Sequence, residues 1–162
     1  MCFDCSGFVY YYFLQIGKWQ ALEEIKQFVA QTKHIDINQI QKIYAAEYVD
    51  FLKSEQSSRH WQPVDPLHLQ HGDLIVYAMD EKNRPHPHCM LVDQILKSDD
   101  ESVTLTVVDS TKTPHANDTR SPNQTGIGRG TIILYPHNGK CNSFLWGKVV
   151  YHRNLFFTRI RE

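Results

Sequence analysis

Hydrophobic residues in the first third of the chain recur at the spacing of an amphipathic helix. This pattern predicts three helices, over residues 5–16, 19–33 and 36–54. Asp36 is a suitable N-cap for the third. Segment 57–66 is polar and contains two prolines, so we expect a loop there. The N-terminal part of the chain is therefore predicted to be helical.

The pattern changes after Gly72, where short apolar or alternating runs, several of them β-branched, predict strands. The predicted strands are 73–79, 89–96, 103–108, 131–135, 149–151 and 155–160. Because helices precede strands, the fold class is α+β, with N-terminal helices packed on an antiparallel five- to six-stranded sheet or a partly open barrel. We expect one domain over 1–162, with a helical part at 1–56 and a sheet part at 69–162.

One predicted connection, 110–130, is much longer than the others and rich in Thr, Pro, Asn, Asp and Gly. Long loops in small domains are often functional. Its last five residues, Gly126–Gly130, superficially resemble a phosphate-binding loop. A predicted strand follows them where a helix would be needed, so we expect a turn or bulge there.

Composition excludes several classes of function. The chain of 162 residues has a formal net charge of −1, so no basic excess indicates nucleic-acid binding. No apolar run approaches the roughly 18–20 residues of a membrane-spanning helix. A chain of this length can bury a core without a disulfide framework, although it has four cysteines. The sequence leaves the oligomeric state open.

Cys5 stands at the start of the first predicted helix. Free N–H groups and a partial positive charge at a helix N-terminus favour the nucleophilic thiolate. His88 directly precedes strand 89–96, where an imidazole can act as the base of a thiol nucleophile. Asp109 follows strand 103–108 and is a candidate to orient that imidazole, with His115 as the alternative. These residues predict a Cys-His-Asp catalytic site.

Four further residues are candidates for substrate binding. Asp4 and Ser6 flank Cys5, and His115 and Arg120 lie in the long connection. A loop of this kind can form the rim of a cleft, with the Arg120 guanidinium meeting a substrate carboxylate.

Metal binding is the rival interpretation. Cys2 and Cys5 have C-x-x-C spacing, and His88 and Cys89 add two more donors, so a zinc site is chemically conceivable. A catalytically inactive binding domain that uses the same four residues is a further alternative.

Three motifs together resemble those of a known family. Residues 4–9 (Asp-Cys-Ser-Gly-Phe-Val) resemble the nucleophile motif of NlpC-type cell-wall cysteine peptidases, which are papain-like and related to CHAP amidases. Residues 69–75 (Leu-Gln-His-Gly-Asp-Leu-Ile) resemble the step that opens the first strand of their sheet. Residues 88–92 (His-Cys-Met-Leu-Val) resemble their histidine and the strand that follows it.

This resemblance implies a papain-like fold and a hydrolase that needs no cofactor. It implies that Cys5 is the nucleophile, that His88 is the base, and that a third polar residue lies on the next strand. Asp109 falls at that position, where the family often has histidine. The implied substrate is an amide bond of a peptide, by default the stem peptide of bacterial peptidoglycan. Family members are often exported, but this chain shows no export signal, so its localisation stays open.

Overall fold

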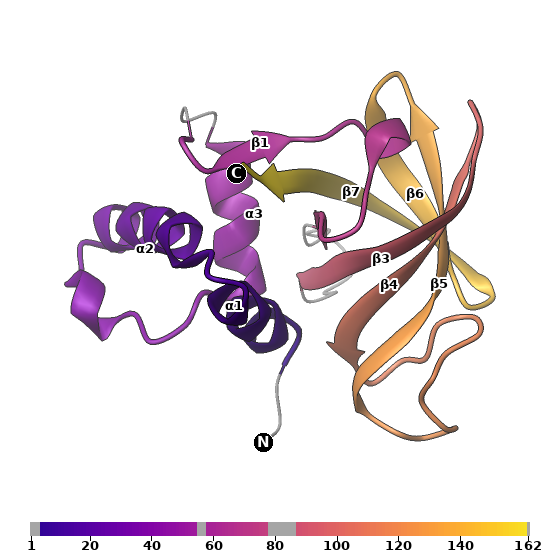
Figure 1. Cartoon of the computed structure of the whole chain (residues 1–162), viewed down its shortest axis with the longest axis horizontal. Coiled ribbons are helices and arrows are strands. Elements are labelled where there is room, and N and C mark those ends of the chain that lie inside the picture. The colour runs from indigo at the N-terminus through magenta and orange to yellow at the C-terminus, as the bar shows by residue number, and fades with distance from the viewer. Residues whose placement is uncertain (1–3, 55–57, 78–86, 162) are drawn as a thin grey trace.

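The computed structural model describes residues 4–54, 58–77 and 87–161. Its helices form one layer, and all its strands but the first form a barrel beside that layer (Figure 1). The helices are α1 (Cys5–Gln15), α2 (Trp19–Lys33) and α3 (Ala45–Lys53), with single 3₁₀ turns η1 (Ile37–Gln39) and η2 (Pro66–His68).

The first two helices follow the predicted boundaries closely. In α1, the Asp4 carboxylate accepts a hydrogen bond from the Gly7 backbone N–H at 2.6 Å, which satisfies one free donor of the first turn. Val9 and Phe13 face the core from this helix. His34 ends α2 in the left-handed conformation, with φ of 54°. None of the helices in the described residues is long and apolar enough to cross a membrane.

The third predicted helix, 36–54, is wrong in its first half. The Asp36 side chain caps only the 3₁₀ turn η1, and the backbone is extended at Ile40 and Tyr44. Helix α3 starts at Ala45, because the Glu47 carboxylate accepts a hydrogen bond from the Tyr44 N–H at 2.8 Å. The apolar positions before it, including the fully buried Ile43, thus belong to an irregular segment that packs on the core.

The predicted α+β class is confirmed, and the barrel is closed. Strands β2 to β7 pair antiparallel in the order β2-β3-β4-β5-β6-β7, and β7 pairs again with β2. The predicted partly open form is therefore corrected, because this last pairing leaves no free edge between β7 and β2. The strands are β1 (Trp61–Pro63), β2 (Leu74–Tyr77), β3 (His88–Ser98), β4 (Val103–Thr111), β5 (Gly126–His137), β6 (Lys140–Trp146) and β7 (Val149–Ile160).

Strands β2 and β3 are apolar on both faces because each face packs on a different core. Leu74 and Val76 point to the helices, whereas Ile75 points into the barrel. On β3, Cys89 joins the helical core and Met90 the barrel core. Strand geometry sends successive side chains to opposite faces. Two adjacent residues of β3 can therefore reach both layers of the molecule.

The strand predictions missed β1 and β6, and they divided β7 into two. The pair Asn138–Gly139, with φ of 51° and 71°, forms the tight turn that joins β5 to β6. Gly147, with φ of 61°, lies in the turn between β6 and the continuous β7. Residues 78–79 of the predicted strand 73–79 lie outside the described residues.

The predicted turn or bulge at Gly126–Gly130 is also wrong, because these residues open β5 and pair with β4. Two glycines there make room for the long connection. A Cβ on Gly128 would lie 2.4 Å from the Arg120 Nε, and a Cβ on Gly130 would lie 2.4 Å from the His115 Cβ. The connection thus packs directly against the bare backbone of β5.

We predict that Gly130→Ala lowers the free energy of unfolding by about 1–3 kcal/mol, because the new methyl group overlaps the buried His115 side chain. Urea denaturation measures this change. Arg129→Ala, on the exposed face of the same strand, is the matched control and should stay within about 0.5 kcal/mol of wild type. Equal stability of the two variants would contradict the close packing.

Candidate active site

Cys5 is the first residue of α1, and its side chain is half-buried between the two layers. Asp4 fixes this helix start: besides capping Gly7, its carboxylate pairs with the Lys42 ammonium at 2.5 Å. The thiol therefore lies where the unpaired N–H groups of α1 favour a negative charge.

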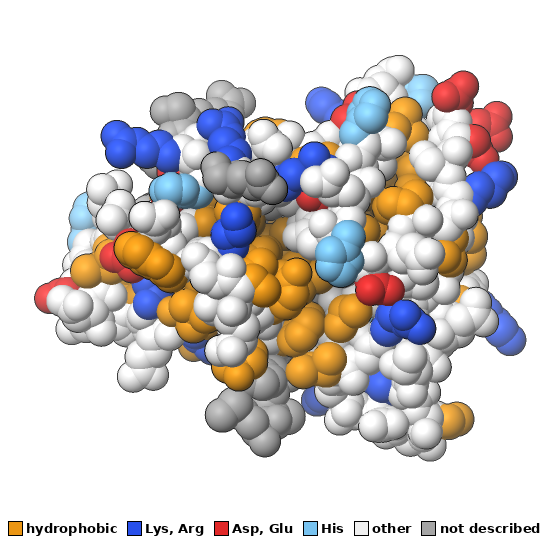
Figure 2. Space-filling view, in the orientation of Figure 1, with side chains coloured by type: hydrophobic (Ala, Val, Ile, Leu, Met, Phe, Trp, Pro, Cys, Tyr) orange, Lys and Arg blue, Asp and Glu red, His pale blue; other side chains and the backbone are white. Residues whose placement is uncertain are grey.

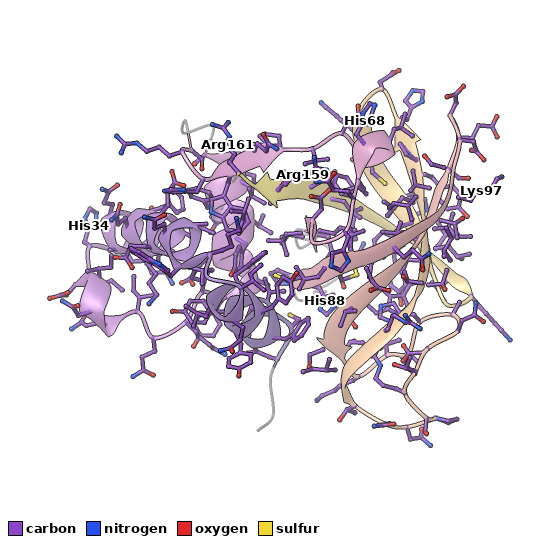
Figure 3. All side chains as sticks on the ribbon, in the orientation of Figure 1. His34, His68, His88, Lys97, Arg159 and Arg161 are labelled. Atoms are coloured by element: carbon purple, nitrogen blue, oxygen red, sulfur yellow. The ribbon has the colours of Figure 1, made fainter. Side chains whose placement is uncertain are left out.

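His88 opens β3 on the side of the barrel that faces α1 (Figure 3). Its Nε2 lies 2.6 Å from the Asp109 Oδ2 of the neighbouring β4, and the two residues are 7% and 0% exposed. The rings of Tyr77 and Trp146 contact the imidazole, with centroids 5.6 and 5.5 Å away. These contacts fix the position of the His88 ring in an apolar setting.

Cys5 makes hydrogen bonds with two side chains of β3, His88 and its neighbour Cys89. The Cys89 hydrogen bond, then the His88 hydrogen bond and charge, outweigh partial burial and lower the pKa of the Cys5 thiol to about 4. Burial favours neutral His88, but hydrogen bonds with Asp109 and Cys5 raise the pKa of its imidazole to about 9. At neutral pH the pair is therefore thiolate and imidazolium.

Asp109 is kept ionised although it is fully buried. Burial disfavours its charge, but the imidazoles of His115 and His88 lower the pKa of the carboxyl below its ordinary value. On the side away from His88, the Arg120 Nη2 donates to the Asp109 Oδ1 at 3.2 Å. The carboxylate thus has a cationic partner on each side, which limits the cost of burying it.

Arg120 is itself held by Asp118 and by the backbone. Its Nη2 and Nε lie 2.6 and 2.8 Å from the two oxygens of Asp118, and its Nη1 donates to the Gly126 carbonyl at 2.8 Å. The His115 ring stacks on Trp146 with centroids 4.0 Å apart, and the Trp146 Nε1 bonds to the backbone of the connection. Residues 112–125, which connect β4 to β5, therefore pack behind Asp109. We call this segment the wall.

The structure brings the three predicted catalytic residues together, whereas three of the four predicted substrate-binding residues are buried. The side chains of His115 and Arg120 are 0% and 1% exposed, so they lie inside the wall and not at a rim. Ser6 is 3% exposed and bonds to Asp4. All three side chains have partners inside the protein, and their role in substrate binding stays a prediction. Asp4 is exposed at the helix start, where it serves as the cap.

His115, the alternative third residue, reaches Asp109 from the wall: its Nε2 lies 3.4 Å from the Asp109 Oδ2. The direct partner of His88 is Asp109. Of the predicted zinc ligands, Cys2 lies outside the described residues. Within 4–54, 58–77 and 87–161, no cluster of three or more His, Cys, Asp or Glu side chains could hold a metal ion.

Sequence reasoning overlooked three members of the site, namely Tyr77, Asp118 and Trp146. Trp146 ends β6, a strand that the turn signal Asn138–Gly139 could have revealed. Asp118 lies two residues before Arg120, but no local pattern shows that both turn inward. Nothing near Tyr77 in the sequence indicates contact with a residue eleven positions later.

Comparison with known proteins adds no relative. No protein-family model matches the chain, and no curated protein and no solved structure matches it.

We predict that the rate of Cys5 alkylation by iodoacetamide stays nearly constant from about pH 8 down to about pH 5 and falls only near pH 4. The sign follows from the pKa: above it the thiolate is fully formed, and below it the unreactive thiol takes over. Peptide mapping identifies the labelled cysteine. Buried Cys141, whose thiol pKa is raised, is the internal control and should react slowly throughout.

His88→Gln removes the imidazolium, so the inflection of Cys5 alkylation should move to higher pH. An inflection in the wild type near the ordinary thiol value of about 8.5 would contradict an ion pair.

We predict that Arg120→Gln lowers the free energy of unfolding by about 3–5 kcal/mol, because two buried carboxylates lose their shared cation. Chemical denaturation measures the loss. Arg129→Gln, whose side chain is 56% exposed, serves as the control and should change stability little. A similar small effect at both positions would show that the wall does not depend on its buried guanidinium.

Proposed function

We propose that this protein is a thiol hydrolase that cleaves amide bonds, with Cys5 as nucleophile, His88 as proton carrier and Asp109 as the group that orients His88. One observation supports the proposal most strongly. Three elements that are separate in sequence, α1, β3 and β4, bring together a low-pKa thiol, an imidazole that interacts with it, and a buried carboxylate hydrogen-bonded to that imidazole. Perturbed pKa values of this kind are typical of catalytic groups.

The reaction would proceed in two half-reactions. The Cys5 thiolate attacks the amide carbonyl carbon, a C–S bond forms, and the carbonyl oxygen becomes an oxyanion. The His88 nitrogen that does not face Asp109 gives its proton to the leaving nitrogen, and the C–N bond breaks. Water then attacks the thioester and loses its proton to the same nitrogen, and cleavage of the C–S bond restores the thiolate.

Two features of the site suit this chemistry. The Cys5 backbone N–H lies at the first position of α1, where helix N–H groups have no acceptor within the helix, and would be available to an oxyanion. Asp109 holds His88 by its Nε2, which directs the other ring nitrogen to the substrate. The Tyr77 and Trp146 rings that contact His88 give it an apolar surrounding, which strengthens its interaction with Asp109.

We extend the proposal to a papain-like fold and to peptidoglycan stem peptides as substrate. The resemblance to NlpC-type peptidases implies a cysteine on a helix packed against an antiparallel sheet that carries the histidine. The motifs at residues 4–9, 69–75 and 88–92 together carry that resemblance. The substrate class rests on the motifs alone, so its test is separate from that of the mechanism.

We predict that wild-type protein forms one covalent adduct on Cys5 with an activated ester and that Cys5→Ala forms none. Intact-mass and peptide analysis measure the adduct. With purified stem peptides, Cys5→Ala should lose turnover by roughly a thousandfold or more, while circular dichroism stays unchanged. Cys141→Ala, which removes a buried thiol of the barrel core, is the matched control and should remain active.

Unchanged ester or peptide cleavage by Cys5→Ala would refute the mechanism. Acylation of Cys5 without release of any product from stem peptides would refute the substrate class and leave the nucleophile in place.

A further inference from the structure

The site contains a second thiol that the proposed hydrolysis does not use. Cys89 follows His88 on β3, is 0% exposed, and belongs to the same core cluster against which Cys5 packs. The alternation of the strand sends His88 towards Asp109 and Cys89 towards α1. The two sulfur atoms share a hydrogen bond, in which the protonated Cys89 thiol donates to the Cys5 thiolate.

We propose that Cys5 and Cys89 form a reversible redox pair, in which Cys89 captures Cys5 as a disulfide after oxidation by a peroxide. The inference rests on the same Cys5 thiolate as the proposed function but requires no substrate. Cys141, the third described cysteine, lies in the barrel core and takes no part.

The chemistry has two balanced steps. The Cys5 thiolate attacks one oxygen of hydrogen peroxide, the O–O bond breaks, and Cys5 sulfenic acid and hydroxide result. The Cys89 sulfur then attacks the Cys5 sulfur, an S–S bond forms and the S–O bond breaks. The Cys89 proton and the departing hydroxide leave as water. The peroxide oxygens are reduced and the two thiols are oxidised.

The first step itself makes the second easier. Burial raises the pKa of the Cys89 thiol well above its ordinary value, and the neighbouring Cys5 thiolate raises it further by hydrogen bond and charge. Sulfenic acid at Cys5 is neutral, so the effect of the thiolate charge on Cys89 disappears once Cys5 is oxidised. The sulfur atoms must then close from hydrogen-bonding contact to about 2.0 Å. Cys5 is half-buried and can meet peroxide, whereas Cys89 is fully buried and cannot.

The test exposes the full chain to hydrogen peroxide, blocks remaining thiols and maps the peptides without reduction. The expected product is a Cys5–Cys89 cross-link, with loss of Cys5 alkylation that dithiothreitol restores. In Cys89→Ser, Cys5 should proceed to sulfinic acid, which dithiothreitol does not reverse. Cys141→Ala is the matched control and should form the same cross-link as wild type.

Cys2→Ser should also retain the cross-link, since Cys2 has no role in the proposal. Wild-type Cys5 that is oxidised to sulfinic acid as fast as in Cys89→Ser, or that links to Cys2, would overturn the proposal. These readouts are masses and labelling, not hydrolysis. If the cross-link forms but no amide is cleaved, the redox pair is supported and the proposed function fails. If amides are cleaved but no cross-link forms, the proposed function is supported and the redox pair fails.

Discussion

The buried contact between His88 and Asp109 is the interaction on which the rest of the site depends. A carboxylate at 0% exposure is tolerated only if cations face it, and here an imidazolium lies on one side and Arg120 on the other. The second cation requires the wall formed by the long connection, and the wall requires the glycines of β5. The ionised Asp109 in turn keeps a proton on His88, and that charge stabilises the Cys5 thiolate.

Closure of the barrel gives this chain of charges its rigidity. His88 on β3 and Asp109 on β4 are held in register by the antiparallel pairing of these two strands. Strand β2 pairs with β7 and so closes the barrel around them. Hydrophobic side chains gather over the junction between the helices and the barrel (Figure 2). This junction packs α1, and Cys5 with it, against the outer faces of β2 and β3.

Sequence periodicity predicted the helices and strands whose formation depends on nearby residues of the chain. Helices α1 and α2 and most of the strands follow from apolar spacing, and Cys5 and His88 lie at element starts as predicted, whereas Asp109 lies within β4. Periodicity failed where distant packing decides the outcome. Ile40 and Ile43 have helical spacing, but they anchor an irregular segment to the core. Gly128 and Gly130 suggest a turn, yet they are strand residues. They lack side chains because Arg120 and His115 pack directly against them, and no local pattern reveals this packing.

Because the site is divided between two layers, the acidity of the Cys5 thiol depends on the contact between the helices and the barrel. His88 and Asp109 both belong to the barrel, whereas Cys5 is carried by the helical layer through the first turn of α1. Partial unfolding that detaches the helices would leave His88 and Asp109 assembled and return Cys5 to an ordinary thiol. The acidity of one cysteine thus reports whether the two layers are docked.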